Sequence, residues 1–362
     1  MAADPAGTDP MNRVARLYAA HDLRVETEPA PMPGKGQVLL RMAAGGICGS
    51  DLHYYHDGGF GPVRVRQPII AGHEASGHVA ALGLGVDGPA PGTLVAVNPS
   101  QPCGTCEYCA RGQPIHCLNM QFMGSAMRLP HAQGMFRDLL VVPAAQVQAF
   151  PQGTTPAEAA CTEPLAVCLH AVSQAVALLG DLAGLRVMIT GAGPIGLLVL
   201  AAARHAGATE VIVTDLTDAA LERARAMGAA QTINVASDAA AMEPLAEGKG
   251  QVDLLFDCSA AASALRNAFA VLRPRGVLIQ VGVTGDMTIP LNALVGKEIT
   301  WRGSQRFHDE FAVAARLIGS REIDVRPIIS HSLPLARAVE AFELASDRSM
   351  ACKVHLTFGD ET

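Results

Sequence analysis

The stretch VMITGAGPIG, residues 187–196, decides the fold of the chain. A short apolar run leads into the pattern G-x-G-x-x-G, and an Ala- and Leu-rich, helix-like run follows it. Gly191 permits a tight turn, Gly193 lets a pyrophosphate approach the backbone, and Gly196 lets the helix lie close to the strand. The N-terminus of such a helix carries partial positive charge and free N–H groups, which suit a phosphate. The stretch therefore predicts a dinucleotide-binding turn.

Asp215 supports this interpretation and indicates which dinucleotide is bound. It lies 215 − 196 = 19 positions after Gly196, at the end of the next strand-like run. A carboxylate there accepts hydrogen bonds from a ribose 2′-hydroxyl and repels a 2′-phosphate, which favours NAD over NADP. An ordinary glycine-rich turn is the alternative, and the strand, helix and acid in the expected order argue against it. Four further positions are expected at the cofactor, namely Pro194, Ile195, Val281 and Val283.

Strand-like and helix-like runs alternate from residue 165 to residue 304. Continuous apolar strands between helices predict a doubly wound parallel sheet that is buried on both faces, and six strands complete a dinucleotide-binding fold. The predicted strands cover 186–190, 210–214, 232–235, 252–257, 276–281 and 298–303, and the helices cover 195–205, 218–227 and 260–272.

The preceding part of the chain has a different texture. Gly and Pro break residues 11–164 into short apolar runs, which predicts a β-rich domain. Residues 305–362 follow a sheet that is already complete, with helix-like runs at 311–318 and 335–344 and a strand at 351–356. We expect this last segment to pack back onto the N-terminal domain.

The composition excludes several classes of protein. The 362 residues include 27 Lys+Arg and 34 Asp+Glu, and 49% of them are hydrophobic. Such a chain can bury two cores, which excludes a disordered protein, and its net charge of −7 argues against a nucleic-acid binder. The most apolar stretch, at 194–203, is shorter than the roughly 18 residues of a membrane span. Residues 1–10 are no secretion signal, so we expect a disordered leader and a cytoplasmic protein.

Four cysteines form the sharpest pattern in the chain. Cys103, Cys106, Cys109 and Cys117 have the spacing C-x2-C-x2-C-x7-C, in a loop rich in Gly and Pro. Four thiolates at this spacing complete the tetrahedral shell of a structural zinc ion. Two disulfides or four free thiols are the alternative, and the odd total of nine cysteines argues against full pairing. His116 is a competing ligand, although four sulfurs already fill the shell.

A second set of metal-binding residues is spread along the chain, at Cys48, His73, Glu74 and Glu163. A catalytic zinc needs about three protein ligands and one open position. Spacing alone does not bring these residues together, and a lone Cys or His is more often an ordinary core or surface residue. A metalloprotease H-E-x-x-H pattern is rejected, because the next histidine, His78, is five positions after His73.

The order of these segments resembles that of the zinc-dependent medium-chain dehydrogenases. The segments are 48–53, 72–74, the four-cysteine loop, 163–164 and 191–196, and the resemblance runs from about residue 13 to residue 357. Glu163-Pro164-Leu165 is similar to the polyol (sorbitol-type) branch, because classical alcohol dehydrogenases have Cys at that glutamate. The stretches 53–55, 124–128 and 130–131 resemble the L-idonate-oxidising members of this branch.

The resemblance implies an α/β architecture and a zinc site. A GroES-like catalytic domain would cover 11–164, completed by 305–362, and a Rossmann NAD-binding domain would cover 165–304. Cys48 and His73 would ligate the catalytic zinc, with Glu74 as the remaining carboxylate ligand. Glu163 would then hold the zinc-bound water or ligate in another state, and the sequence leaves open which glutamate binds.

Two further groups of residues follow from the resemblance. Ser50 and His53 would form a proton relay, although a turn-capping serine and a plain surface histidine remain alternatives. Tyr54 and Arg306 would contact the substrate, with Arg128 as a second candidate or a solvated loop residue. An anionic sugar acid needs a cation, and a guanidinium can bind a carboxylate with two hydrogen bonds.

These expectations combine into one function. The leading hypothesis is a zinc-dependent, NAD-linked oxidation of a secondary hydroxyl of a sugar acid, of the type L-idonate to 5-ketogluconate. A sorbitol- or xylitol-type polyol dehydrogenase is the alternative, and a non-catalytic NAD(H)-binding protein is a remote one. The partner would be a small molecule, with no nucleic acid and no membrane. The resemblance implies a homodimer or homotetramer formed through the Rossmann domain, with 283–299 as candidate edge material.

Overall fold

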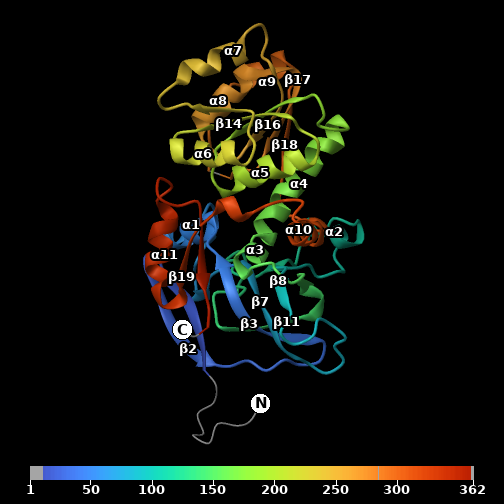
Figure 1. Cartoon of the computed structure of the whole chain (residues 1–362), viewed down its shortest axis with the longest axis vertical. Helices are drawn as coiled ribbons and strands as arrows, with labels where there is room; N and C mark the ends of the chain where they lie inside the picture. The colour runs from blue at the N-terminus through green and yellow to red at the C-terminus, as the bar shows by residue number, and fades with distance from the viewer. Residues whose placement is uncertain (1–10, 284, 360–362) are drawn as a thin grey trace, which may run out of the picture. The chain divides into compact units, whose positions relative to one another are not determined.

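The computed structural model describes residues 11–283 and 285–359 and divides the chain into two compact units (Figure 1). The first unit comprises Met1–Glu163, His331–Asp347 and Lys353–Thr362, and the second comprises Pro164–Ser330 and Arg348–Cys352. The leader expected at 1–10 lies outside the described residues. The sequence suggested that all of 305–362 joins the first unit, whereas contacts assign 305–330 and 348–352 to the second.

A six-stranded parallel sheet forms the centre of the second unit. Its order is β15-β14-β13-β16-β17-β18, so the chain runs outward from β13 to one edge and then from β16 to the other. This is the Rossmann order, and its switch point lies between β13 and β16. The strands are β13 (Arg186–Thr190), β14 (Glu210–Asp215), β15 (Gln231–Asn234), β16 (Val252–Asp257), β17 (Leu272–Gln280) and β18 (Thr300–Gly303).

Helices between the strands build the rest of the second unit. They are α4 (Thr162–Leu179), α5 (Pro194–His205), α6 (Asp218–Ala226), α7 (Glu243–Ala246), α8 (Ala262–Val271), α9 (Leu291–Gly296) and α10 (Glu310–Gly319), with short 3-10 turns η3 (Ala239–Met242) and η4 (Arg326–Ile328). One core cluster joins Met188, Leu255 and Leu278 of the sheet to Leu265 and Phe269 of α8. The apolar strands are thus buried as the sequence predicted.

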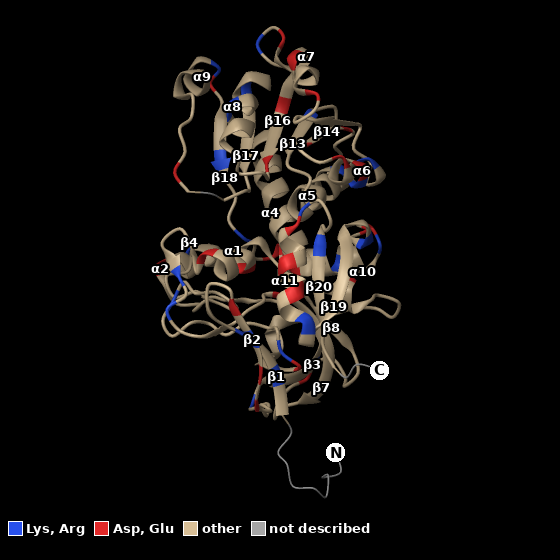
Figure 2. Cartoon of the chain, turned by 90° about the vertical axis from the view of Figure 1, so that its left-hand side faces the viewer, with Lys and Arg blue, Asp and Glu red and all other residues tan. Residues whose placement is uncertain are grey.

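Helix α4 is long and apolar enough to cross a membrane. The sequence analysis singled out the shorter apolar stretch 194–203 instead. Half of α4 is buried inside the protein, which is typical of the core helix of a folded domain. Lys and Arg are interspersed with Asp and Glu on both units (Figure 2), in keeping with a modest net charge.

The first unit is built on a seven-stranded sheet of order β12-β8-β7-β3-β20-β19, with β11 also paired to β3. The strands are β3 (Gln37–Gly46), β7 (Glu74–Leu82), β8 (Leu94–Val97), β11 (Leu139–Pro143), β12 (Val147–Ala149), β19 (Ile329–Pro334) and β20 (Lys353–Thr357). Strand β3 is long enough to pair twice along one edge: residues 37–41 pair with β11, and residues 44–46 pair with β20. The C-terminal strand β20 therefore lies between β3, from the N-terminal part of the chain, and β19.

Smaller elements surround this sheet. A three-stranded sheet consists of β2 (Asp22–Pro29), β1 (Met11–Ala19) and β6 (Ile69–Ile70), and two strand pairs are β9 (Ser100–Gln101) with β10 (Gln121–Phe122) and β4 (Gly59–Phe60) with β5 (Val63–Arg64). The helices are α1 (Gly49–Asp57), α2 (Glu107–Ala110), α3 (Pro156–Ala160) and α11 (Ala338–Ser346), with 3-10 turns η1 (Pro114–His116), η2 (Ala144–Gln146) and η5 (Leu335–Arg337). Alternate residues of β3, Val38, Leu40 and Met42, are buried, as expected for one covered face.

Candidate functional site

Three candidate metal ligands meet where β3 pairs with β7. Cys48 follows β3 and caps the N-terminus of α1, His73 precedes β7, and Glu74 is the first residue of β7. Gly46 pairs directly with Glu74 in the antiparallel register, which brings the ends of the two strands together. One ligand atom from each of Cys48, His73 and Glu74 lies within 4.8 Å of the other two. Three donors of this kind leave the fourth position of a tetrahedral zinc ion open.

The state of these side chains fits a cation. Burial, followed by the Glu74 carboxylate, raises the pKa of the Cys48 thiol to about 12. His73 is 6% exposed, and its Nδ1 is buried with no hydrogen-bond partner among the described residues. A divalent metal binds cysteine as the thiolate and histidine as the neutral imidazole, so it would offset the cost of ionising the buried Cys48 thiol and bind one ring nitrogen of His73. The donor set therefore fits the zinc ion that the sequence predicted.

Asp51 supports both ligand-bearing segments, and the sequence reasoning missed it. The side chain is fully buried, and it accepts hydrogen bonds from the N–H groups of Cys48 and Gly72, each across 3.1 Å. One carboxylate oxygen also lies 3.8 Å from His73 Nδ1. Carboxylates that orient a ligating histidine are a common feature around metals. The available signal was an acid three residues after Cys48, the capping-box spacing, which has meaning only once α1 is known to begin there.

Glu163 lies near the trio but is not one of its members. It is 5% exposed at the start of α4, and burial raises its pKa to about 8, with His73 opposing and Glu74 reinforcing that shift. Among the described residues, the metal-sized cluster contains Glu74 and leaves Glu163 out. The geometry therefore favours Glu74 as the third ligand, with Glu163 held close by as a carboxyl group of raised pKa.

A buried lysine completes this cluster, and no sequence pattern indicated it. Lys353 of β20 is 3% exposed, and its Nζ lies 2.9 and 2.7 Å from the two carboxylate oxygens of Glu74. The two residues are 279 positions apart in the chain, so only the pairing of β20 with β3 brings them together. The weak signal was a lysine inside the strand predicted at 351–356.

Helix α1 carries the residues expected in the proton relay and at the substrate. Ser50 is half-buried in its first turn, and His53 is exposed, with Nδ1 3.2 Å from a carboxylate oxygen of its neighbour Asp57. Tyr54 is buried, and its hydroxyl accepts a hydrogen bond of 3.2 Å from the N–H of Ala126. Their roles in catalysis stay predictions.

The two candidate arginines have different surroundings. Arg128 donates from Nε to the carbonyl of Met120 across 2.8 Å and from Nη2 to the carbonyl of Leu118. These contacts tie Arg128 to the segment that follows Cys117, so its guanidinium acts as a tether there. Arg306 belongs to the second unit and is half-buried, with a left-handed backbone conformation (φ 50°).

The four cysteines of the predicted structural site converge as expected for a metal. The sulfur of Cys106 lies 3.6 Å from that of Cys109 and 3.9 Å from that of Cys117. A tetrahedron with Zn–S bonds of about 2.3 Å has sulfur–sulfur edges of about 3.8 Å, whereas a disulfide bond is about 2.05 Å long. Backbone N–H groups of Cys103, Cys106 and Asn119 point at these sulfurs and would stabilise thiolates. The loop therefore fits a zinc ion with a closed shell of four sulfurs.

The glycine-rich turn has the conformation that its sequence requires. Gly191 has φ 87°, which only glycine adopts without strain, and its N–H donates to the carbonyl of Thr214. A Cβ on Gly196 would lie 1.8 Å from the carbonyl oxygen of Gly191, so the strand and helix could not approach each other with any larger residue. Gly193 caps α5, with Pro194 as its first residue, and open space surrounds its α-carbon. This arrangement suits a phosphate at the helix N-terminus.

Other predicted cofactor positions lie at the carboxyl ends of the same strands. Asp215 ends β14, while Val281 is buried and Val283 is exposed just after β17. The sequence reasoning missed Asp257 at the end of β16, which is fully buried and accepts hydrogen bonds from Thr190 (2.5 Å) and Gln280 (2.6 Å). It links the ends of β13, β16 and β17, at the edge where α/β folds bind their ligands.

Comparisons with known proteins agree with both units. Residues 34–152 match the family described as "Alcohol dehydrogenase GroES-like domain", and residues 194–320 match "Zinc-binding dehydrogenase". The L-idonate 5-dehydrogenase (NAD(P)(+)) of Escherichia coli K12 is 38% identical over 321 residues, 88% of this chain and 91% of that protein. The sorbitol dehydrogenase of Gallus gallus is 35% identical over 338 residues, 92% of each chain.

Solved structures give the same result. The crystal structure of L-idonate 5-dehydrogenase from Escherichia coli K-12 has a TM-score of 0.90 and 36% identity, covering 96% of this chain and 99% of that one. An Escherichia coli enzyme complexed with NADH and a Sinorhizobium meliloti zinc-binding dehydrogenase bound to NADP each have a TM-score of 0.85, at 27% and 29% identity. Each of these two comparisons covers 96% of this chain and 99% of the other chain.

Fold, metal-ligand clusters and relatives agree on one assignment. The first unit is GroES-like and carries two clusters suited to zinc, and the second is a Rossmann domain with a dinucleotide turn. These are the parts of a zinc- and NAD-dependent enzyme that acts on the CH–OH group of its substrate. The chain belongs to the zinc-dependent medium-chain dehydrogenase family, in its polyol branch.

Proposed function

We propose that this enzyme oxidises a secondary hydroxyl of a sugar acid, as in the conversion of L-idonate to 5-ketogluconate, with NAD as the hydride acceptor. The observation that carries the chemistry is the trio Cys48, His73 and Glu74, whose ligand atoms lie within 4.8 Å of one another. The choice of a sugar acid is supported by the 38% identity to an L-idonate 5-dehydrogenase over 88% of the chain.

The chain's own residues have separate roles in this reaction. Cys48, His73 and Glu74 hold the zinc ion, which supplies a Lewis acid that polarises the substrate hydroxyl oxygen. Ser50 Oγ would accept the substrate hydroxyl proton as it gives up its own proton to the relay. His53, exposed at the next turn of α1 and in contact with Asp57, would release a proton to solvent at the outer end. The turn at 191–196 and Asp215 hold and orient NAD.

Arg306 is the residue that we assign to the substrate carboxylate. Arg128, which donates two hydrogen bonds to backbone carbonyls just after Cys117, is the second candidate. Tyr54, buried on α1 and bonded to Ala126, would contact substrate hydroxyls. A guanidinium that binds a carboxylate with two hydrogen bonds gives both affinity and orientation.

Oxidation of a neutral polyol such as sorbitol or xylitol is the second candidate. It is supported by sorbitol dehydrogenases that are 33–35% identical over more than 90% of the chain. The same zinc and NAD machinery would serve both reactions, so only the substrate contacts distinguish them. A non-catalytic NAD(H)-binding protein would have no use for the trio and would bind zinc only at the four cysteines.

The experiment measures cofactor reduction by the zinc-loaded enzyme across a panel of substrates. The panel contains L-idonate, D-gluconate, sorbitol, xylitol, threonine and ethanol, each with NAD and with NADP. Preference for L-idonate with NAD is the expected result, and preference for sorbitol or xylitol would replace the sugar acid by a neutral polyol. Inactivity on every substrate, with zinc confirmed at both clusters, would contradict the proposed function.

A variant pair tests the carboxylate contact. Arg306→Ala should raise KM for L-idonate about 10- to 100-fold, because a charge-assisted pair contributes roughly 1.5–3 kcal/mol. KM for xylitol should change much less. Arg266→Ala, at an exposed arginine of α8, is the control and should leave both KM values unchanged.

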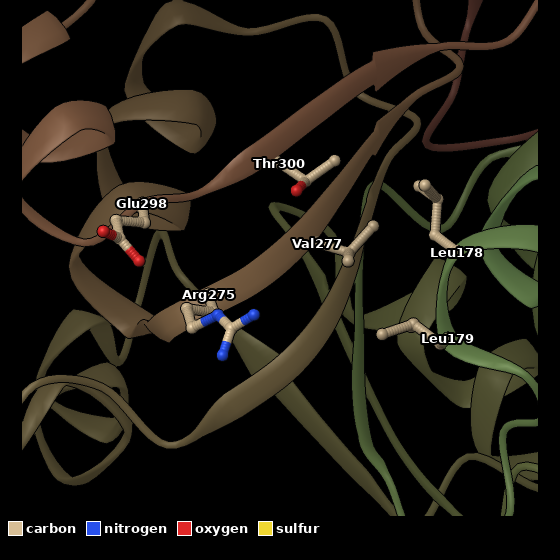
Figure 3. A pocket seen from close by; sticks show the side chains of 6 residues that line it. All are labelled: Leu178, Leu179, Arg275, Val277, Glu298 and Thr300. Atoms are coloured by element: carbon tan, nitrogen blue, oxygen red, sulfur yellow. The ribbon is translucent and has the colours of Figure 1, made fainter.

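We also propose that the enzyme is a homodimer or homotetramer that uses the β18 edge of the Rossmann sheet. A hollow of about 500 Å³ lies beside this edge (Figure 3). Its lining residues come from α4, β17, β18 and the turn just before β18. They are Leu178, Leu179, Arg275, Val277, Glu298 and Thr300. Nearby α9 exposes 60% of Leu291 and 66% of Val295, and such apolar exposure beside the edge strand of a sheet is typical of an interface.

Light scattering tests this assembly. The double variant Leu291→Asp/Val295→Asp should reduce the mass in solution, because two buried charges without partners oppose association. Val339→Asp changes an exposed apolar residue of α11 instead. It is the control and should keep the wild-type mass. An unchanged mass for the double variant would exclude this edge as the interface.

The cysteines support a cytoplasmic location. None of the nine cysteines forms a disulfide in the described part of the chain, and all nine are at least partly buried. Thiols and thiolate–metal clusters persist where the surroundings are reducing, whereas secreted proteins favour disulfides. Cell fractionation that recovers the enzyme outside the cytoplasm would contradict this proposal.

A further inference from the structure

A buried ion pair joins Lys353 to Glu74, one residue of the metal trio. Lys353 Nζ is 2.7 Å from Glu74 Oε2 and 2.9 Å from Glu74 Oε1, and its third contact is the carbonyl of Ile47 at 3.2 Å. The side chains of Lys353 and Glu74 are 3% and 1% exposed. All three ammonium donors therefore have acceptors, and both oxygens of one candidate ligand are bound by the same cation.

The sheet is built to accommodate this pair. Gly46 of β3 pairs with Glu74 on one side and with His355 of β20 on the other. A Cβ on Gly46 would lie 2.4 Å from Glu74 Oε2. Because Gly46 has no side chain, the Glu74 carboxylate can lie across β3 toward Lys353. The lack of a side chain at Gly46 thus leaves room for the contact between Glu74 and Lys353 beside the metal ligands.

The charges around Lys353 indicate what its contact with Glu74 does. Cys48 as a thiolate, with Glu74 and Asp51 as carboxylates, would place three negative charges in one buried cluster. A zinc ion offsets two of them, and the Lys353 ammonium offsets the third. His355 adds no charge, since burial and the neighbouring Lys353 lower its pKa to about 3. Buried charges that lack partners are strongly destabilising, so this balance matters.

The contact also acts on Glu74 as a ligand. An ammonium on both oxygens withdraws electron density that the carboxylate would otherwise donate to the metal. A cation close to the metal also repels it. Both effects weaken the bond between Glu74 and the metal and leave the ion more electron-poor, which is the state that polarises a hydroxyl oxygen best.

We propose that Lys353 is a positioning residue of the catalytic metal centre, which orients Glu74 and limits how strongly Glu74 binds the zinc. The inference rests on the trio of the proposed function being the zinc site. It goes beyond that function by assigning a role to a residue from the C-terminal strand. It predicts that removal of the Lys353 charge makes the zinc bind more tightly and makes the enzyme less active.

The test compares three variants of the full-length protein. Lys353→Met removes the charge at similar length, and Lys353→Arg keeps it. Lys297→Met is the matched control, because Lys297 also places its Nζ on three acceptors, the carbonyls of Phe269, Ala270 and Leu272 at 2.8 Å, but in the second unit. The readouts are zinc affinity by chelator competition and the visible spectrum after replacement of zinc by cobalt, with kcat measured alongside.

Lys353→Met should bind zinc at the catalytic site about tenfold more tightly or more, shift the cobalt spectrum and lower kcat. Lys353→Arg should restore wild-type affinity and spectrum, and Lys297→Met should change only the melting temperature. Zinc affinity in Lys353→Met that is unchanged or weaker, with the protein still folded, would overturn the proposal. Chelator competition needs no substrate, so it stands apart from a failure of the proposed reaction.

If Lys353→Met does not fold, Lys353→Arg and the double variant Glu74→Gln/Lys353→Met decide. The double variant replaces a charged pair by a neutral one of similar shape. It should fold and bind zinc more weakly than Lys353→Arg, because Glu74 no longer supplies a charge. Equal affinity with and without the Glu74 charge would contradict the role given to Lys353.

Discussion

The backbone N–H of Ala192 donates a hydrogen bond of 2.7 Å to Asp215 Oδ2, so the glycine-rich turn and the acid that ends β14 are directly joined. The other carboxylate oxygen accepts from the N–H groups of Leu216 and Thr217 at 2.7 and 3.0 Å. The carboxylate is therefore fixed in orientation before any cofactor binds. A rigid acid discriminates between cofactors more sharply than a mobile one, since it does not move away from a phosphate.

Asp215→Ser should lower kcat/KM for NAD about 10- to 100-fold and raise it for NADP. The variant loses a charged acceptor for the ribose and a charge that repels a 2′-phosphate, and a charged hydrogen bond is worth roughly 1.5–3 kcal/mol. Steady-state kinetics with both cofactors measure the effect. Asp218→Ser, at an exposed acid that binds Asn234 instead, is the control. Retained preference for NAD in Asp215→Ser would contradict the role of this acid.

Gly46→Ala should empty the catalytic zinc site. The new Cβ would lie 2.4 Å from Glu74 Oε2, so the carboxylate must leave its position. We expect the zinc content to fall from about two ions per chain to about one, and the activity to fall at least about 100-fold, since a catalytic zinc needs about three protein ligands. Elemental analysis and kinetics measure both.

Gly49→Ala is the matched control for this change. Gly49 is three residues away at the start of α1, and a Cβ there meets no atom within 4 Å. It should keep both zinc ions and wild-type activity. Two zinc ions in Gly46→Ala would show that Glu74 is not needed as a ligand.

Cys106→Ser should remove the structural zinc and lower the melting temperature by about 5–10 °C, because metal binding contributes directly to folding of such a loop. The sulfur of Cys106 is 3.6 Å from Cys109 and 3.9 Å from Cys117, so it is central to the cluster. Cys352→Ser, outside both clusters, should keep two zinc ions. Calorimetry with zinc analysis distinguishes loss of this ion from loss of the catalytic one.

Glu310 makes the second unit sensitive to acid. Burial alone would raise its pKa, but hydrogen bonds from His170 and from the N–H of His308 outweigh burial and hold it at about 2. A folded-state pKa below the unfolded value stabilises the protein above the unfolded pKa of about 4.5, and this stabilisation is lost as pH falls toward 2. Glu310→Gln should therefore cost about 2 kcal/mol of unfolding free energy at pH 7.

Urea unfolding at pH 7, 5 and 4 tests that expectation. The difference between wild type and Glu310→Gln should be largest at pH 7 and begin to shrink below about pH 5. Glu243→Gln, at an exposed glutamate of α7, should show no such trend. A difference that is constant with pH would mean that the Glu310 charge is not the stabilising feature.

The Rossmann half of the chain was predicted closely, because its signals are local. The predicted strands 186–190 and 252–257 are the observed β13 and β16, and the predicted helix 195–205 differs from α5 by one residue. A buried parallel strand is apolar throughout, and each one is separated from the next by a helix. These patterns are complete within about thirty residues, so no distant contact is needed to recognise them.

The fold of the GroES-like half depends on contacts between residues far apart in the chain, so the sequence predicted fewer of its elements. The long hairpin β1–β2, helix α1 and helix α4 were missed, and the C-terminal strand was only expected to return to the N-terminal domain. Cys48, His73 and Glu74 were proposed together through resemblance, since their spacing gives no geometry. Asp51 and Lys353 escaped prediction because each acts through partners that strand pairing brings close.

The position of β20 has a consequence for how the protein is made on the ribosome. Gly46 pairs with His355, so β3 must wait for a strand that is 355 − 46 = 309 positions further along the chain. At about 5–20 residues per second, that interval lasts roughly 15–60 s. Throughout it the nascent first unit has an unpaired edge beside Glu74 and no Lys353. The catalytic metal site therefore matures last, after the whole Rossmann unit has emerged, although the three ligands of the trio are among the first 75 residues made.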